Sequence, residues 1–299
     1  MNLDERIIAL KEEMDATILA HNYQIPPIQD LADFLGDSLE LSIRASEVDK
    51  KTIVFCGVTF MAETAKILNP GKRVLVPRRD AKCPMAEMAT AVDIARARQE
   101  HPGAAVVAYV NTHAEVKAAS DICCTSANAL KIVESVEEDE IIFLPDMHLA
   151  NYVATQTEKT IIPWRGFCYV HARMLASEIR EAKKMHPDAV LLVHPECPAD
   201  VIDLADEVLS TGGMVRYARE SDAREFLIGT EEGLIYRLSK ENPGKRFMPA
   251  GTPRTCTGMK RITLPDLHES LSRGRYDIDL PEEIVRGAER SLRRMIELS

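Results

Sequence analysis

The sequence predicts an α/β protein made of three copies of one unit. Three segments share the same order of features, namely a basic residue, a short apolar strand, a proline and a loop that leads to a cysteine; they are 72–84, 159–168 and 245–256. Their cysteines, Cys83, Cys168 and Cys256, lie 85 and 88 residues apart. A nearly constant period of this kind indicates internal repeats. We therefore expect three related units that bring their cysteines to a common metal centre.

Helices and strands are expected to alternate in the first unit. The pattern predicts a helix at 1–14, a helix after Pro26 and Pro27 that runs to Leu35 with Gly36 as its left-handed cap, a helix opened by Asp37 and Ser38, and a helix at 60–68. Short apolar runs predict strands at 17–20, 52–56 and 73–77.

The second and third units are expected to repeat this order. Strands are predicted at 105–110, 121–125, 141–144, 160–163, 190–193, 208–210, 226–228 and 246–248. Helices are predicted at 85–100, from Ser126 onward, and at 147–155, 172–185, 232–240, 264–272 and after Pro281. Because hairpin signals are missing between the strands, we expect parallel sheets with right-handed crossovers. The expected division is 1–84, 85–169 and 170–257 for the three units, with a helical tail at 258–299 that packs back on the first unit.

Composition excludes several classes of protein. The 299 residues are 45% hydrophobic and 28% charged with a net charge of −10, an ordinary globular profile. We find no basic stripe interleaved with aromatic residues, so we expect no nucleic-acid partner. The sequence has no apolar run of about 18 residues, and its first helix is acidic and amphipathic, so we expect no membrane association and a cytoplasmic location.

Seven cysteines in such a chain indicate metal binding or catalysis rather than disulfides. Four of them lie in or beside apolar strands and are expected to be buried small hydrophobic residues: Cys56, Cys123, Cys124 and Cys197. The adjacent pair Cys123 and Cys124 should point to opposite faces of a strand.

The remaining three cysteines leave two metal centres open. They come from three units without any C-x-x-C pair, which does not suit the usual four-thiolate zinc site. Zinc with a fourth ligand such as His171 stays possible. Alternatively, three thiolates on a cubane iron–sulfur cluster leave one iron without a protein ligand, and that iron acts as a Lewis acid suited to dehydration.

Candidate site residues follow the strands, because ligands of open α/β sheets bind beyond the carboxyl ends of the strands. The first strands end at His21 and Tyr23, Tyr109 and Asn111, and His194 and Glu196; the second strands end at Asp37–Ser38, Ser126 and Ser210–Thr211; the last strands lead to the cysteines, with His171 shortly after one of them. Each hydroxyl entering a helix serves equally well as a cap or as a seat for a carboxylate or phosphate. Three of them at equivalent places favour a shared anion site.

Six motifs resemble those of the quinolinate synthase family, in the right order and over nearly the whole chain. They are HNYQ (21–24), GDSLEL (36–41), MAETAK (61–66), CYVH (168–171), HPEC (194–197) and STGGM (210–214). The resemblance implies three homologous three-layer α/β/α units with short parallel sheets around a pseudo-threefold axis. It also implies a [4Fe-4S] cluster held by Cys83, Cys168 and Cys256. The implied reaction condenses iminoaspartate with dihydroxyacetone phosphate to quinolinate, phosphate and two waters on the de novo route to NAD.

The same resemblance implies roles for individual residues. Tyr23 matches a tyrosine that assists proton transfers, Glu196 a general base, and His194 its neighbour in proton handling. Substrate carboxylates and phosphate would be held by His21, Ser38, Tyr109, Asn111, Ser126, His171 and Thr211. An aspartate oxidase or dehydrogenase is implied as the functional partner that supplies iminoaspartate.

Two other functions remain in competition. A diphthamide-synthesis type of radical S-adenosylmethionine enzyme also draws three cluster cysteines from three related domains, although the HNYQ, GDSLEL and HPEC stretches favour quinolinate synthase. A non-catalytic iron–sulfur sensor would need the cysteines but not Tyr23, His194 or Glu196.

Overall fold

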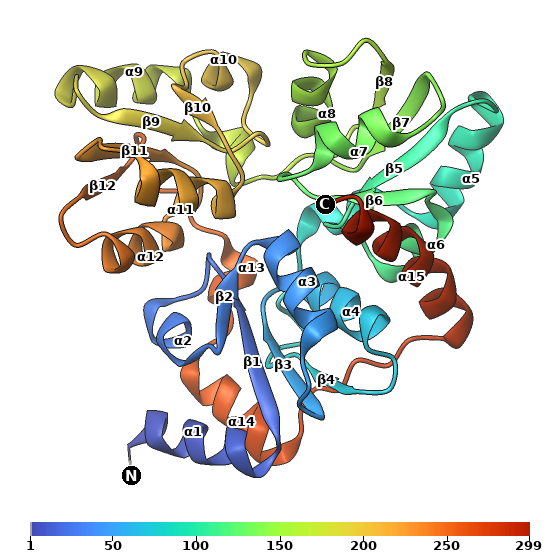
Figure 1. Cartoon of the computed structure of the whole chain (residues 1–299), viewed down its shortest axis with the longest axis vertical. Helices are drawn as coiled ribbons and strands as arrows, with labels where there is room; N and C mark the ends of the chain where they lie inside the picture. Colours follow the sequence, from blue (N-terminus) through green and yellow to red (C-terminus); the bar gives the residue numbers. More distant parts are fainter. Residues whose placement is uncertain (1) are drawn as a thin grey trace.

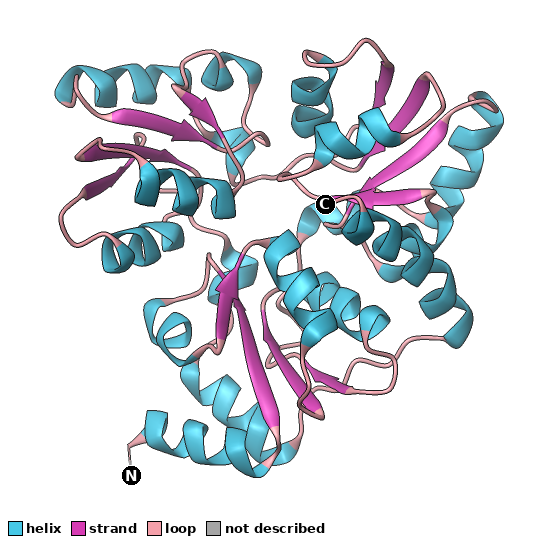
Figure 2. Cartoon of the chain, viewed as in Figure 1, coloured by secondary structure: helices cyan, strands magenta, loops and turns pink. Residues whose placement is uncertain are grey.

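The computed structural model describes residues 2–299 and contains three parallel four-stranded sheets flanked by helices (Figure 1). The strand orders are β2-β1-β3-β4, β6-β5-β7-β8 and β10-β9-β11-β12. All three sheets therefore have the same topology, with the first strand of each unit beside the second and third. The three units surround a common centre (Figure 2). The predicted α/β class with three repeated units is confirmed.

The first unit differs from the prediction at its second helix. Its elements are α1 (Leu3–Glu13), β1 (Ala16–His21), α2 (Pro26–Leu31), β2 (Phe34–Gly36), α3 (Ser38–Glu47), β3 (Thr52–Cys56), α4 (Thr59–Leu68) and β4 (Arg73–Leu75). The predicted helix to Leu35 is wrong, because α2 stops at Leu31 and the next residues form a strand paired with the end of β1. Gly36 is thus the end of a strand and not a left-handed cap.

The second unit contains η1 (Pro84–Met88), α5 (Ala91–Glu100), β5 (Ala105–Tyr109), α6 (Ala114–Ala119), β6 (Ile122–Cys124), α7 (Ala129–Ser135), β7 (Glu140–Leu144), α8 (Met147–Ala154) and β8 (Thr160–Pro163). The helix predicted at 85–100 is two helices, because the Thr90 side chain accepts the N–H of Asp93 and caps a new start. The helix predicted to open at Ser126 begins only at Ala129, and Ser126 lies in the preceding turn.

The third unit contains η2 (His171–Arg173), α9 (Ala176–Met185), β9 (Val190–Val193), α10 (Ala199–Ile202), β10 (Glu207–Val208), α11 (Thr211–Glu220), β11 (Glu225–Gly229), α12 (Gly233–Glu241) and β12 (Arg246–Pro249). The helix predicted at 172–185 is again split in two. The tail forms α13 (Thr257–Lys260), α14 (Leu264–Arg273) and α15 (Glu282–Glu297). Helix α14 packs on α1, whereas α15 packs mainly on α6 and β6. The tail therefore bridges the first and second units instead of covering the first alone.

A partly exposed ion pair repeats in all three units and shows the internal symmetry at the level of single residues. In each unit an aspartate just before the second strand accepts a backbone N–H of the first strand, at 2.8, 2.7 and 2.7 Å. The same aspartate forms an ion pair with a basic residue in the helix that precedes the first strand. The three sets are Lys11–Asp33–Ile18, Arg98–Asp121–Val106 and Lys183–Asp206–Leu191. This contact fixes the amino end of each sheet, opposite the end where ligands are expected.

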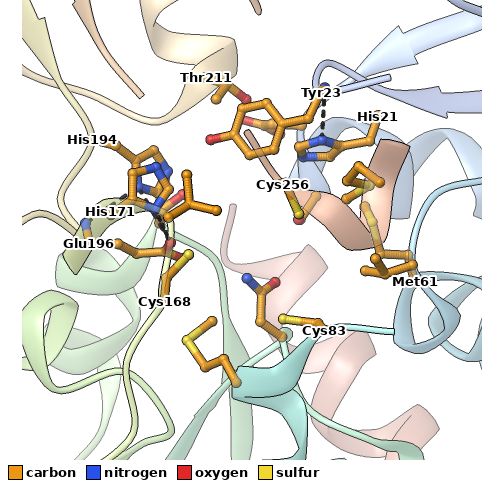
Figure 3. Close-up of a pocket in the computed structure, with 18 of the residues that line it drawn as sticks. His21, Tyr23, Met61, Cys83, Cys168, His171, His194, Glu196, Thr211 and Cys256 are labelled. Atoms are coloured by element: carbon orange, nitrogen blue, oxygen red, sulfur yellow. Dashed lines mark hydrogen bonds and ion pairs between the residues drawn. The ribbon is translucent and has the colours of Figure 1, made fainter. Parts of the chain in front are cut away.

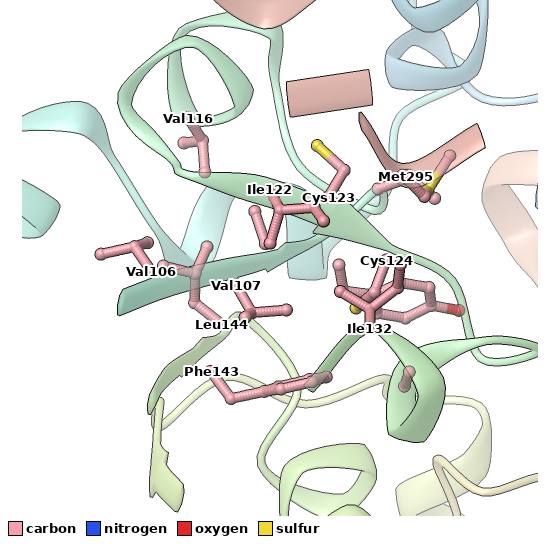
Figure 4. Packing of buried hydrophobic residues seen from close by; sticks show 14 of the residues in the cluster. Val106, Val107, Val116, Ile122, Cys123, Cys124, Ile132, Phe143, Leu144 and Met295 are labelled. Atoms are coloured by element: carbon pink, nitrogen blue, oxygen red, sulfur yellow. The ribbon is translucent and has the colours of Figure 1, made fainter. Parts of the chain in front are cut away.

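The four cysteines expected in the core are buried there. Cys56, Cys123, Cys124 and Cys197 are fully buried. Figure 4 shows Cys123 and Cys124 on opposite faces of β6, where Cys123 Sγ lies 3.4 Å from the hydroxyl of Ser291 in α15. Among residues 2–299, no helix has the length and hydropathy of a membrane-crossing segment.

Candidate active site and metal centre

One cavity lies where the carboxyl ends of the three sheets meet (Figure 3). The centres of water-sized molecules can occupy about 60 Å³ of it. All thirteen site residues predicted from the sequence line it: His21, Tyr23, Ser38, Cys83, Tyr109, Asn111, Ser126, Cys168, His171, His194, Glu196, Thr211 and Cys256. Val58, Phe60, Met61, Met85, Val170 and Met259 complete an apolar wall. Few water molecules lie beside such a wall, so the charges of the polar side chains next to it are weakly screened.

Two histidines are held in the same way at the ends of β1 and β9. His21 Nδ1 accepts the N–H of Tyr23 at 3.1 Å, and His194 Nδ1 accepts the N–H of Glu196 at 3.3 Å. In a neutral ring, the proton then lies on Nε2. Burial lowers the pKa of His21 to about 4. Burial, with His171 nearby, lowers the pKa of His194 to about 3. Both rings are therefore neutral at pH 7 and carry their proton on Nε2.

A chain of polar contacts joins Tyr23 to Glu196 through two residues between them. The Tyr23 hydroxyl lies 2.6 Å from Thr230 Oγ1, which lies 2.8 Å from His171 Nε2. His171 Nδ1 lies 2.7 Å from Glu196 Oε2. With the His171 proton on Nδ1, facing the carboxylate, Nε2 accepts from Thr230 and Thr230 accepts from Tyr23. All donors then point toward Glu196. The other carboxylate oxygen, Oε1, has no hydrogen-bond partner within residues 2–299.

The charges in this chain are set by burial and by neighbours. Burial opposes ionisation of Glu196, but its polar contacts with His171 and Tyr109 outweigh the burial and lower the pKa of the carboxyl below its usual value. Burial, and secondly the charge of Glu196, raise the pKa values of Tyr23 and Tyr109 well above 10. At neutral pH the site therefore contains a carboxylate that can act as a base and two protonated tyrosines that can act as acids.

Asp37 joins two helix N-termini that face the cavity. Its Oδ1 accepts the N–H groups of the first turn of α3, at 3.0 and 2.9 Å, and Oδ2 accepts from the Ser210 hydroxyl at 2.9 Å and Gly212 N–H at 3.2 Å at the start of α11. A Cβ on Gly212 would lie 2.6 Å from Asp37 Oδ2. This close approach requires glycine and places Ser38 and Thr211, the first residues of the two helices, beside the cavity.

The three predicted metal ligands come from different units and point into the cavity (Figure 3). Burial, and next the neighbouring Cys256, raise the pKa of the Cys83 thiol to about 12. Burial likewise raises the pKa of Cys168, with Glu196 and Cys83 as further causes. All three thiols are free of disulfides. A bound cation would offset the unfavourable burial of the negative charge and stabilise the thiolates. The donor set of three half-buried thiols that line one cavity fits a cluster.

A second donor group overlaps the first. The ligand atoms of Cys168, His171 and Glu196 lie within 4.8 Å of one another and could hold a single ion. The three cysteines do not form such a compact group, but a cubane binds each thiolate to a different iron and so needs them further apart. The compact group contains only one of the three cysteines, so it differs from a zinc site made of the three cysteines and His171.

Sequence reasoning missed Thr230, which connects Tyr23 and His171. It follows β11, the third strand of its unit, whereas the candidate residues predicted from the sequence follow the first, second and last strands. The general rule that ligands gather at the carboxyl ends of strands would have included this position. Asp146 and Glu231, which follow the third strands of the second and third units, were missed for the same reason.

Comparison with known proteins identifies the family. A family model described as "Quinolinate synthetase A protein" matches residues 5–297. A quinolinate synthase from Methanoregula boonei is 54% identical over 296 residues, covering 99% of this chain and 98% of the relative. Quinolinate synthases from Pyrococcus horikoshii and Thermodesulfovibrio yellowstonii are 51% and 52% identical, covering 100% and 98% of this chain and 100% and 97% of those relatives. The chain therefore belongs to the quinolinate synthetase A family.

Proposed function

We propose that the chain is an enzyme of NAD biosynthesis that condenses iminoaspartate with dihydroxyacetone phosphate to give quinolinate, phosphate and two waters. The observation that carries this proposal is the convergence of the thirteen predicted residues, from three units, on one cavity. Relatives about half identical over their whole length bear the name quinolinate synthase. The substrate iminoaspartate would come from an aspartate oxidase or dehydrogenase, and we propose that the reaction takes place in the cytoplasm.

Cys83, Cys168 and Cys256 would hold a [4Fe-4S] cluster in this proposal. When bound, such a cluster supplies one iron without a protein ligand, which acts as a Lewis acid in dehydration. The apolar wall formed by Met61, Met85 and the other lining residues limits access of water to this side of the cavity.

Glu196 would act as the general base and Tyr23 as an acid. Glu196 lines the cavity and would take a proton from a substrate carbon, while His171 at 2.7 Å from Oε2 stabilises the carboxylate in the resting state. For a proton lost from Tyr23 to be replaced along the contacts at 2.6 and 2.8 Å, every donor in the chain would be reversed. Glu196 Oε2 then gives the proton it has gained to His171 Nδ1, His171 Nε2 gives its proton to Thr230, and Thr230 gives its proton to Tyr23. The acid and the base thus belong to one chain of polar contacts.

The anionic groups of the substrates would be held by local donors, because the protein itself has a net charge of −10. Ser38 and Thr211 offer hydroxyl groups at two helix N-termini. The neutral His21 and His194 offer Nε2–H donors. Asn111 has a buried amide oxygen without a partner in the described chain, suited to accept a substrate hydroxyl.

An anaerobic assay tests the proposal. The chain is purified without oxygen, its iron and sulfide are measured, and it is incubated with both substrates while quinolinate is quantified. We expect quinolinate to form with the full chain and to disappear in Glu196→Gln. Cleavage of S-adenosylmethionine without quinolinate would favour the radical enzyme. A chain that binds iron and sulfide but converts none of these substrates would favour a sensor.

A further inference from the structure

A backbone hydrogen bond anchors each of the three cysteine loops in the same way. The N–H of the residue that starts the crossover after the third strand donates to a carbonyl two residues before the cysteine. The pairs are Thr59 to Ala81 at 2.8 Å, Met147 to Gly166 at 2.8 Å and Glu232 to Arg254 at 2.9 Å. These bonds align the three units residue by residue at the cavity. The residues that precede the three donors are therefore equivalent: Val58, Asp146 and Glu231.

In the second and third units this equivalent residue is a fully buried carboxylate that holds the cysteine itself. Asp146 Oδ2 accepts the N–H of Cys168 at 2.9 Å, while Oδ1 accepts the N–H of Leu149 in α8 at 2.8 Å. Glu231 Oε1 accepts the N–H of Cys256 at 2.9 Å, while Oε2 accepts the N–H of Gly233 in α12 at 2.7 Å. Each carboxylate thus connects a cysteine to the first turn of a neighbouring helix.

Only a carboxylate can make both bonds. An asparagine or glutamine offers one acceptor oxygen, so its NH₂ group would face the second N–H donor. Glu231 is further fixed by Lys260, 2.9 Å away, which also donates to the carbonyl oxygen of Tyr23. This lysine connects the Cys256 loop with the segment that carries His21 and Tyr23. In the first unit Val58 has no acceptor, so Cys83 lacks the corresponding bond.

We propose that Asp146 and Glu231 are positioning residues that set the backbone of Cys168 and Cys256 so that both thiols face the metal centre, whereas Cys83 is placed without such a carboxylate. The inference deepens the proposed function and rests on its three-cysteine centre. Residues that orient metal ligands in this way typically contribute about 10–100-fold to metal affinity.

The test compares Asp146→Asn and Glu231→Gln with a matched control, Asp121→Asn. Asp121 also accepts a backbone N–H, from Val106 at 2.7 Å, but at the amino end of a sheet. The full chains are purified without oxygen, and iron per chain, iron release to a chelator and the electron paramagnetic resonance spectrum of the reduced protein are measured. We expect both site variants to bind iron roughly 10–100-fold more weakly and to show an altered spectrum. The control should resemble the wild type.

Hydrogen exchange of the metal-free chain provides a readout that needs no cluster. The amides of Cys168 in Asp146→Asn and of Cys256 in Glu231→Gln should exchange faster than in the wild type, and the two variants test the inference independently if one of them does not fold. The inference would be overturned if the two site variants matched the wild type in iron release, in spectrum and in amide exchange. It would also be overturned if Asp121→Asn lost as much iron as the site variants. A wild-type chain that binds no iron would instead refute the proposed centre, and the exchange rates would still decide the role of the carboxylates.

Discussion

Thr230 gives the sharpest test of the proton path, because its hydroxyl contacts both Tyr23 and His171. The change Thr230→Val keeps the shape and removes contacts of 2.6 and 2.8 Å. Each buried polar group left without a partner costs about 1–3 kcal/mol. Water in the cavity can satisfy the Tyr23 hydroxyl, so we expect a loss of about 2 kcal/mol, equal to a fall in Tm of roughly 4 °C for a chain of this size.

The same change should lower kcat more than it changes KM. Positioned acid–base groups contribute about 10²–10⁴-fold to rate, and with Glu196 intact we expect a loss near the lower end, about 10²-fold. The assay is steady-state quinolinate formation without oxygen, with iron per chain measured in parallel. Thr230→Ser keeps the hydroxyl and serves as the control. Wild-type kcat in Thr230→Val, at equal iron content, would refute the proposed path.

Three further predictions address the base, the helix junction and a charged contact between units. Glu196→Gln should keep its iron and lose about 10²–10⁴-fold in kcat; iron analysis with turnover checks this, and normal turnover would exclude the residue as the base. Gly212→Ala places a methyl group 2.6 Å from Asp37 Oδ2, so we expect about 1–3 kcal/mol of destabilisation and a raised KM, whereas an unchanged urea midpoint would contradict the close approach. His113 lies 3.2 Å from Glu63 and 3.3 Å from Glu87, and Glu63 above all raises the pKa of His113 above 6.5. Its stabilising contribution is therefore complete below pH 6.5 and is lost as the pH rises through the higher, folded-state pKa. The difference in unfolding free energy between wild type and His113→Asn should then be larger at pH 6 than at pH 9, and an equal difference at both would be against this ion pair.

The repeated strand–proline–cysteine pattern was enough to predict the three units, although its strands β4, β8 and β12 lie at the sheet edges and are only partly buried. The central strands β1, β5 and β9 were predictable because they are buried and read as continuous apolar runs. Shorter elements could not be predicted so well. The strand Phe34–Gly36 has only three residues and follows a helix with the same apolar character, so its pairing with β1 decides its conformation. The breaks at Thr90 and before α9 similarly depend on local capping and on the loops that carry the cysteines.

The candidate site was predictable for residues that carry a recognisable motif and less so for those that act through contacts. His21 and Glu196 lie at or just after the ends of first strands, in the HNYQ and HPEC motifs, and the three cysteines lie in the loops of the repeated strand–proline–cysteine pattern. Thr230 is an ordinary threonine in the sequence, and its position between Tyr23 and His171 results from packing of the first and third units. The bond from Asp146 to the backbone of Cys168 likewise joins residues 22 positions apart, which no local pattern reveals.

The most direct test of the metal centre is the iron and acid-labile sulfide content of the anaerobically purified chain and of its cysteine variants. We expect about four iron and four sulfide per wild-type chain, a large loss in Cys83→Ala, Cys168→Ala and Cys256→Ala, and no loss in Cys123→Ala, whose thiol is buried in the core. A single metal ion without sulfide, or iron that is retained in all three of the first variants, would contradict the proposed cluster.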